Sequence, residues 1–267
     1  MAKYKKKRAR ELQHDRFRDT TMSFFDRLGD QLEGRGRTIL YGLGAFILAA
    51  VLVVAFVKWR NRKADEAQQA LGRAISISST ALANPIAGTT EPTFGNEKER
   101  AQRATEEFEK VAAKYGDPYR SEARYFIAAN RLVLDRPKAM SELAELSNSK
   151  VAEVAALSKF ALAQANESDG KLDEAARLYS ELAKLNSPTI TQETANLRLA
   201  KVYEKQDKKK EAADLLFNIV DASRKAKGPD NLSLPTSSAA REAADELKKL
   251  DPDRYRQLPA ENPLLAG

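Results

Sequence analysis

The sequence predicts an all-α protein in which one transmembrane helix is followed by an α-solenoid of antiparallel helix pairs. Two observations lead to this prediction. Residues 38–57 form a run of twenty residues without a charge, TILYGLGAFILAAVLVVAFV. Residues 104–219 repeat a pattern of small and large apolar residues every 35 to 37 residues. Leu, Ala, Glu and Lys, which favour helices, are common in this second segment, and runs of β-branched residues are few.

The uncharged run has the length of a membrane span. Twenty helical residues at about 1.5 Å each cover a hydrocarbon core of roughly 30 Å. A buried core helix is rarely apolar on every face, and a cleaved signal peptide has a shorter apolar stretch and a small-residue cleavage site. Here 37 residues precede the run, and VKWRNRK ends it without such a site. We therefore predict an uncleaved anchor, with Tyr41 and Trp59 near the membrane interfaces.

The charges beside the span predict its orientation. Residues 1–37 contain eleven Lys or Arg and six acidic residues, whereas the twenty residues after the span contain five Lys or Arg. Short flanks rich in Lys and Arg stay in the cytoplasm. This favours a cytoplasmic N-terminus and an external C-terminal domain. The cluster KWRNRK, directly after the span, favours the opposite orientation, in which the domain would be a cytosol-facing receptor.

The basic surplus does not indicate a nucleic-acid partner. The net charge is +7, but residues 1–63 have nine more basic than acidic residues, and residues 64–267 have thirty basic and thirty-two acidic ones. The large domain thus has the mixed charges of an ordinary solvated surface. The surplus lies beside the span, where anionic lipids attract Lys and Arg. We expect contact with membrane lipid through the span and the basic tail, and no nucleic acid.

The tail, residues 1–37, contains one candidate amphipathic helix. Ser23 can cap it while Asp26 reaches back, and Phe25, Leu28 and Leu32 share one face. Such a helix would lie in the headgroup plane. A disordered linker is the alternative, and it is favoured for MAKYKKKRAR.

The composition argues against catalysis. The chain has no cysteine and one histidine, His14 in the tail, which excludes cysteine chemistry, zinc-type sites and His-based triads. The glycines near the span are not followed by Lys-Ser or Lys-Thr, so no phosphate-binding loop is present. We expect no enzyme, no cofactor, no metal and no small-molecule substrate. A membrane-tethered hydrolase is therefore disfavoured.

The internal repeat places equivalent residues on one helix face. Each copy has an alanine, a large residue four positions later and an aliphatic residue three positions after that. The partner helix carries another small residue 11 or 12 positions before the alanine. The members are Ala104, Ala139, Ala175 and Ala212; Phe108, Leu143, Tyr179 and Leu216; Val111, Leu146, Leu182 and Ile219; and, on the partner helix, Ala128, Ala163 and Ala200.

These residues resemble tetratricopeptide repeats. The best copy is residues 156–188, with Gly170 in its turn and a closing Pro188, and the next copy begins at Glu193. A degenerate copy begins near Ser121, with Pro137 at its helix junction, and half a copy covers residues 104–111. Fixed-period similarity is typical of stacked repeats, whereas an unrelated helical bundle would need fortuitous spacing.

Proline, glycine and capping residues set the remaining boundaries. We predict a tail at 1–37, the span at 38–57, the helical domain at 58–250 and an irregular C-terminal tail at 251–267. Within the domain we expect helices at 63–82, 96–115 and, as an end cap, 237–250. Loops are expected at 84–96 and 227–235, where Pro and Gly are frequent.

The whole layout resembles the ancillary SecYEG translocon subunit family (YfgM-like proteins). Shared features are a short N-terminal segment, one span rich in small residues, the pair Trp59-Arg60 and an array of helix pairs. The resemblance implies a single-pass inner-membrane protein with a periplasmic domain. It also implies that the anchor associates with the protein-export channel and that the domain contacts periplasmic chaperones and emerging chains. A tetratricopeptide adaptor in cell-envelope assembly or division is the alternative.

The resemblance to tetratricopeptide repeats implies a protein-binding groove, because the first helices of such pairs line the concave face. Tyr125, Phe160 and Leu197 occupy equivalent inward positions, and Gln164 and Lys201 lie one turn further on. Such a groove would suit apolar peptide or helix segments. Apolar residues at helical spacing are usually packing, so a core role for the three apolar residues is the alternative.

The span itself carries a candidate contact surface. Thr38, Gly42, Ala45 and Ala49 fall on roughly one face of the helix. Small residues at this spacing let another transmembrane helix approach closely. If the family resemblance holds, this face would dock on the export channel. The alternative is that glycine and alanine are simply common in spans.

Overall fold

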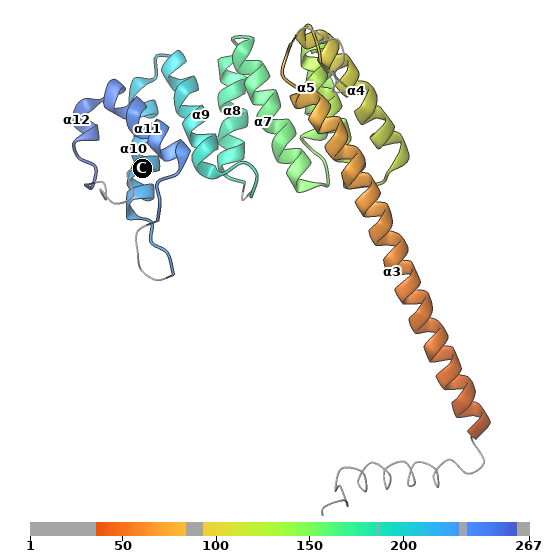
Figure 1. The fold of residues 1–267 in the computed structure, drawn as a ribbon. Coiled ribbons are helices and arrows are strands. Elements are labelled where there is room, and N and C mark those ends of the chain that lie inside the picture. Colours follow the sequence, from red (N-terminus) through yellow and green to blue (C-terminus); the bar gives the residue numbers. More distant parts are fainter. Residues whose placement is uncertain (1–35, 84–92, 186, 230–233, 261–267) are drawn as a thin grey trace, which may run out of the picture. The chain divides into compact units, whose positions relative to one another are not determined.

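The computed structural model describes residues 36–83, 93–185, 187–229 and 234–260. The protein is all-α, as predicted: one long apolar helix near the N-terminus is followed by helix pairs that pack in sequence, consistent with a repeat-like α-solenoid (Figure 1). Leu82 and Phe94 form an isolated β-bridge. The predicted amphipathic helix from Ser23 to Leu32 lies outside the described residues.

The long helix, α3, runs without interruption from Gly36 to Ser79. The sequence predicted two helices here, at 38–57 and 63–82. They are one because the residues between them, KWRNR, and those that follow as far as Leu71 include neither Gly nor Pro, so nothing there ends a helix. The chain divides into two compact units, Met1–Asp65 and Glu66–Gly267. The second unit thus begins eight residues after the predicted boundary at residue 58, and its first buried residue is Ala67.

The second unit contains the end of α3 and a series of shorter helices. Each helix from α4 to α12 packs against the next, and α5 also packs against α7 and α9 against α11. Consecutive helices that pack on each other across short turns run in opposite directions. The helices are α4 (Glu97–Lys114), α5 (Tyr119–Leu134), α6 (Arg136–Leu146), α7 (Ala152–Ser168), α8 (Leu172–Ala183), α9 (Gln192–Lys205), α10 (Lys209–Lys225), α11 (Ser238–Leu250) and α12 (Pro252–Tyr255).

Short polar side chains fix where several helices begin. The side chain of Asn96 accepts a hydrogen bond from the backbone N–H of Glu99 at 2.9 Å, and that of Ser237 accepts one from Ala240 at 3.1 Å. These contacts satisfy N–H groups that have no partner within the helix. The helices predicted at 96–115 and 237–250 are confirmed to within a residue at each end.

The burial of the repeat residues confirms the predicted packing face. Ala104, Ala139, Ala175 and Ala212 are all 0 % exposed, as are the four large residues that follow them by four positions. The small residues of the partner helices, Ala128, Ala163 and Ala200, are equally buried. The alanines therefore lie where two helices approach most closely, and the large residues fill the space beside them.

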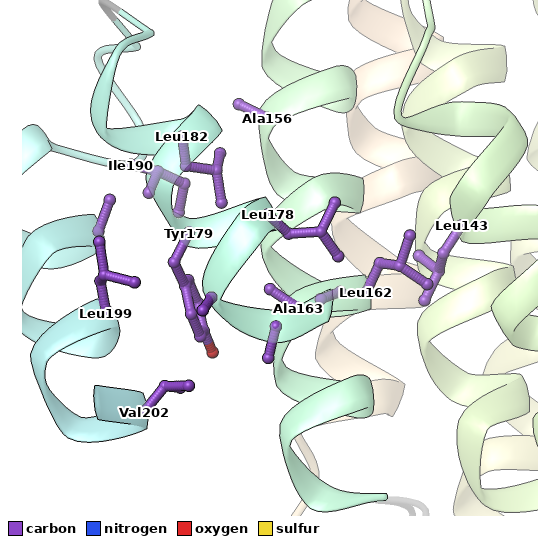
Figure 2. Packing of buried hydrophobic residues seen from close by; sticks show 14 of the residues in the cluster. Leu143, Ala156, Leu162, Ala163, Leu178, Tyr179, Leu182, Ile190, Leu199 and Val202 are labelled. Atoms are coloured by element: carbon purple, nitrogen blue, oxygen red, sulfur yellow. The ribbon is translucent and has the colours of Figure 1, made fainter. Parts of the chain in front are cut away.

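The buried side chains form three clusters along the second unit. The first cluster joins α3, α4 and α5, the central cluster joins α5 to α9, and the C-terminal cluster joins α9, α10 and α11. Figure 2 shows the central cluster, with Tyr179 of α8 facing Leu199 and Val202 of α9 on one side and Ala163 of α7 on the other. Each cluster shares one helix with the next.

Two of the turns between paired helices have the same geometry. Gly170 and Asp207 both adopt a left-handed backbone, with φ of +73° and +59°. In each turn the following N–H, of Lys171 or Lys208, bonds to a carbonyl five residues back at 2.9 Å. This is a Schellman motif, in which glycine is the preferred residue. The first turn has glycine and the second has aspartate, so the second stores some backbone strain.

Exchanging these residues is expected to change stability in opposite directions. Gly170→Ala should lower the free energy of unfolding by about 1–2 kcal/mol, since a Cβ at Gly170 meets nothing within 4 Å and only the left-handed backbone is penalised. Asp207→Gly should raise it by up to about 1 kcal/mol. Gly72→Ala, at an exposed position two turns before the end of α3, is the matched control and should stabilise by about 0.5–1 kcal/mol. Urea denaturation followed by circular dichroism measures all three. A destabilising Asp207→Gly would contradict the assigned turn.

The chain continues in an ordered form beyond the predicted end of the domain. Asp251 accepts from the N–H of Arg254 at 3.0 Å, and Pro252 opens α12. Leu258 is buried in the C-terminal cluster, and Arg224 donates to the carbonyl of Pro259 at 2.5 Å. Residues 251–260 were predicted to be irregular because Asp-Pro stops a helix. The same dipeptide also starts one, with aspartate as the N-cap and proline at the first position.

Candidate functional site: the apolar helix and the first-helix surface

The apolar segment of α3 exposes its large side chains. Within the described residues, most of the exposed large hydrophobic side chains belong to the stretch from Tyr41 to Trp59. Phe46 is 72 % and Leu52 61 % exposed, and none of the apolar window is buried. α3 is the one described helix long and apolar enough to cross a membrane. An apolar surface of this size on every side of a helix indicates a single membrane anchor.

The predicted contact face of the span is open. Gly42, Ala45 and Ala49 are all exposed, and a Cβ built on Gly42 would meet no atom within 4 Å. Thr38 belongs to α3, but its side chain lies outside the described part. The three small residues are therefore free to receive another helix, as close packing in lipid requires.

The predicted groove residues do not form one surface. Tyr125 of α5 and Phe160 of α7 are half-buried against the central cluster, and Gln164 is exposed. Leu197 of α9 is only 4 % exposed and belongs to the C-terminal cluster. For Leu197, the alternative of core packing therefore holds. Lys201, one turn further on, is half-buried and forms an ion pair with Glu242 of α11.

Phe160 has a packing role as well as an accessible edge. Its ring meets the ring of Tyr179 edge to face, with centroids 5.8 Å apart and planes at 66°. Next to it on α7, Lys159 forms an ion pair with Glu181 of α8 at 2.7 Å. A ligand at this face would thus meet an aromatic edge beside fixed charges. The remaining candidates for a peptide contact are Tyr125, Phe160 and Gln164.

Burial also affects the ionisable groups near this face. Burial raises the pKa of the Tyr125 hydroxyl. Burial, and then the nearby charge of Glu153 on α7, raises the pKa of the Glu122 carboxyl on α5. Thr189 donates a hydrogen bond to that same Glu153 at 3.1 Å. Burial is thus the main cause of both pKa shifts.

Two clefts on α4 were not predicted. One, of about 370 Å³, is lined by Ile77, Phe94, Glu99, Gln102, Arg103 and Glu106; the other, of about 190 Å³, is lined by Ala70, Arg73, Glu107, Lys110, Val111, Lys114 and Tyr115. Both are bordered by long charged side chains. Among the described residues, no group of three His, Cys, Asp or Glu could hold a metal ion.

Long-range ion pairs tie the helices together. Arg131 of α5 contacts Glu109 of α4 at 2.7 Å and Glu142 of α6 at 2.5 Å, so one guanidinium links three helices. Glu167 of α7 accepts from Lys205 of α9 at 2.5 Å and from the Tyr179 hydroxyl at 3.1 Å. These partners are 11 to 38 residues apart in sequence, so no local pattern indicates them.

The ionised form of the Glu204 side chain on α9 destabilises the folded protein. One of its oxygens is buried without a hydrogen-bond partner. Burial, and then the charge of Glu246 on α11, raises its pKa above the ordinary value of 4.5. The folded protein therefore binds this proton at a higher pH than the unfolded chain. The resulting destabilisation is present at neutral pH and disappears as the pH falls towards 4.5.

Glu204→Gln is expected to stabilise the protein at pH 7 by on the order of 0.5–1 kcal/mol, because the side chain is only partly buried. At pH 4 the gain should vanish, since wild-type Glu204 is then protonated in both states. Thermal denaturation of residues 64–267 at the two pH values measures the difference. Glu211→Gln removes an exposed charge nearby and serves as the control. An equal gain at both pH values would contradict the proposed cause.

The geometry thus comprises one exposed apolar helix and a stack of helix pairs with a half-buried aromatic surface. Family models, curated proteins and solved structures were each compared with the chain, and none of them matches it.

Proposed function

We propose that this protein is a membrane-anchored, protein-binding scaffold on the envelope side of the inner membrane. One observation carries the proposal: a single chain combines a helix that exposes apolar side chains from Tyr41 to Trp59 with a regular stack of helix pairs. The first feature suits insertion into lipid. The second is an architecture whose extended surfaces commonly bind proteins.

The binding surface is proposed to be tetratricopeptide-like. Support comes from the equal burial of the four repeat alanines and from the matching turns at Gly170 and Asp207. Tyr125 and Phe160 would supply apolar contact and Gln164 a polar one. The expected ligand is an apolar peptide or helix segment from another protein.

The proposed partners are the protein-export channel, periplasmic chaperones and emerging chains. This rests on the resemblance of the layout to ancillary SecYEG translocon subunits. The span would contact the channel through Gly42, Ala45 and Ala49, and the helical domain would remain near the chains that leave it. An adaptor in envelope assembly or division would share the anchor and the stack, and differ only in the partner captured.

The topology can be tested cleanly because the chain has no cysteine. Single cysteines introduced by Ser141→Cys, at an exposed position of α6, and by Ser23→Cys, in the tail, report on each side. A membrane-impermeant maleimide added to intact spheroplasts should label the first and not the second. The reverse result would favour a cytosol-facing receptor, an alternative motivated by the exposed Lys58, Arg60 and Arg62.

Bulky residues on the small face of the span are expected to remove its contact with the channel. A photo-crosslinking residue at position 49 should capture the channel in the wild-type background. Gly42→Leu together with Ala45→Leu should reduce that capture about tenfold or more, since losing close approach removes the packing that drives association in lipid. Membrane insertion should not change.

Gly44→Leu together with Ala55→Leu is the matched control. It makes the same chemical changes on the other side of the helix, at 3.6 residues per turn. This variant should crosslink like the wild type. Retained capture by the first variant would mean that the span is a passive anchor and that specificity lies in the domain.

A further inference from the structure

Three exposed cations directly follow the apolar run of α3. They are Lys58, Arg60 and Arg62, and with Trp59 we name them the basic collar. No acidic residue occurs from Thr38 to Ala64, and the first one after the run is Asp65. None of the three cations forms an ion pair with another residue in the described ranges. The collar is therefore a concentration of positive charge without a counter-charge from the described protein.

The helix distributes these charges around its axis. At about 100° per residue, Lys58 and Arg62 lie on one side, and Arg60 lies on the other. Trp59 lies between them, and the centroid of its ring is 6.1 Å from the centroid of the Phe56 ring. From Lys58 to Arg62 the helix rises about 6 Å. The headgroup region on each side of a bilayer has a similar thickness, about 5–7 Å.

We propose that the basic collar binds the headgroups of anionic phospholipids in the leaflet that borders the C-terminal end of the apolar run. Lipid phosphates match the guanidinium groups of Arg60 and Arg62 in charge and in bidentate geometry. Anionic surfaces attract juxtamembrane cations, and tryptophan prefers the same depth. The proposal rests on the membrane anchoring proposed above and is independent of which side the domain occupies. Headgroup binding by the basic collar would make the span prefer anionic lipids, in addition to matching the thickness of the hydrocarbon core.

The protein contains a built-in reporter for this test. Trp59 is the only tryptophan in the chain and lies within the collar. The full-length protein is reconstituted in phosphatidylcholine vesicles that contain, at equal mole fraction, either brominated phosphatidylglycerol or brominated phosphatidylcholine. Bromine quenches tryptophan only at short range, so the opposite leaflet, about 30 Å away, does not contribute.

Brominated phosphatidylglycerol is expected to quench Trp59 about threefold more strongly than brominated phosphatidylcholine at low salt, because each cation near the surface favours an anionic neighbour. High salt should reduce the difference. Lys58→Gln, Arg60→Gln and Arg62→Gln together should abolish it. The matched control, Lys138→Gln, Lys171→Gln and Lys210→Gln, removes three exposed charges from the second unit and should keep it.

Each of the other possible results contradicts either the basic collar or the membrane anchor. Equal quenching by the two lipids in the wild type overturns the collar while leaving the anchor intact, and would direct attention to an acidic protein segment as the collar's partner. An unchanged preference in the triple-collar variant also overturns it. No quenching by either lipid overturns the anchor itself, and with it the proposed function.

Discussion

Tyr179→Ala is expected to lower the free energy of unfolding by about 3–5 kcal/mol, the range measured when a large aromatic side chain is removed from a core. Tyr179 of α8 is 0 % exposed and packs between α7 and α9 (Figure 2). Its ring meets Phe160, and its hydroxyl donates to Glu167 at 3.1 Å. The truncation leaves a cavity at the centre of the stack, where the neighbouring helices are held by their own contacts and cannot collapse into it. Chemical denaturation of residues 64–267, followed by circular dichroism at 222 nm, measures the loss.

Tyr179→Phe separates the ring from the hydroxyl. It keeps the packing and removes only the hydrogen bond to Glu167, so a loss of about 1 kcal/mol is expected. Glu167 retains its ion pair with Lys205. If Tyr179→Ala cost no more than Tyr179→Phe, the ring would not be in the core and the repeat alignment would be wrong.

Two arginines in the middle of the apolar run are expected to prevent membrane insertion. Leu48→Arg and Val51→Arg place charges near its centre, where each costs about 2.5–3.5 kcal/mol, or about 5–7 kcal/mol together. Both positions are exposed on α3, so no protein contact compensates for the charge. Alkaline carbonate extraction of membranes should release the variant and retain the wild type.

Gln68→Arg and Gln69→Arg provide the control. These exposed residues lie on the same helix beyond the apolar run, and the two changes add the same charge. The control should stay in the membrane fraction. Carbonate resistance of the Leu48→Arg and Val51→Arg variant would show that residues 38–57 do not span the bilayer.

The main architecture could be predicted because each of its two signals extends over many residues. Twenty uncharged residues are enough for a helix to cross a bilayer, and alanines spaced 35 to 37 residues apart indicate stacked repeats. Ala175 and Ala212 are buried, as this spacing required. The continuity of α3 and the existence of α12 could not be predicted in the same way. Each depends on the interpretation of a short segment. For α3, residues 58–63 were interpreted as a boundary between two helices; for α12, Asp251-Pro252 was interpreted only as the end of the preceding helix. The chain after Asp251-Pro252 is held in place by tertiary contacts, such as that of Leu258 with the C-terminal cluster, which the sequence does not show.

The candidate surface was harder to predict because apolar residues that face the core and those that face a groove recur at the same helical spacing. Phe160 and Leu197 are equivalent in the repeat, yet Phe160 keeps an accessible edge and Leu197 is buried between α9, α10 and α11. The difference arises from the end of the stack, where α11 covers α9. Lys201 is held by Glu242 for the same reason. Sequence spacing gives a residue's face on its helix, but not what lies opposite that face.

The sharing of helices between clusters determines how the second unit can open. α5 contributes to the first and central clusters, and α9 to the central and C-terminal clusters. Removing α11 and α12 would expose one side of α9 while leaving its other side packed. Fraying from the C-terminal end therefore requires less free energy than complete unfolding, and amide hydrogens should exchange with solvent sooner in α11 than in α8. A bound partner that covers the end of the stack would suppress this exchange. Binding would then make α11 more rigid without changing the fold.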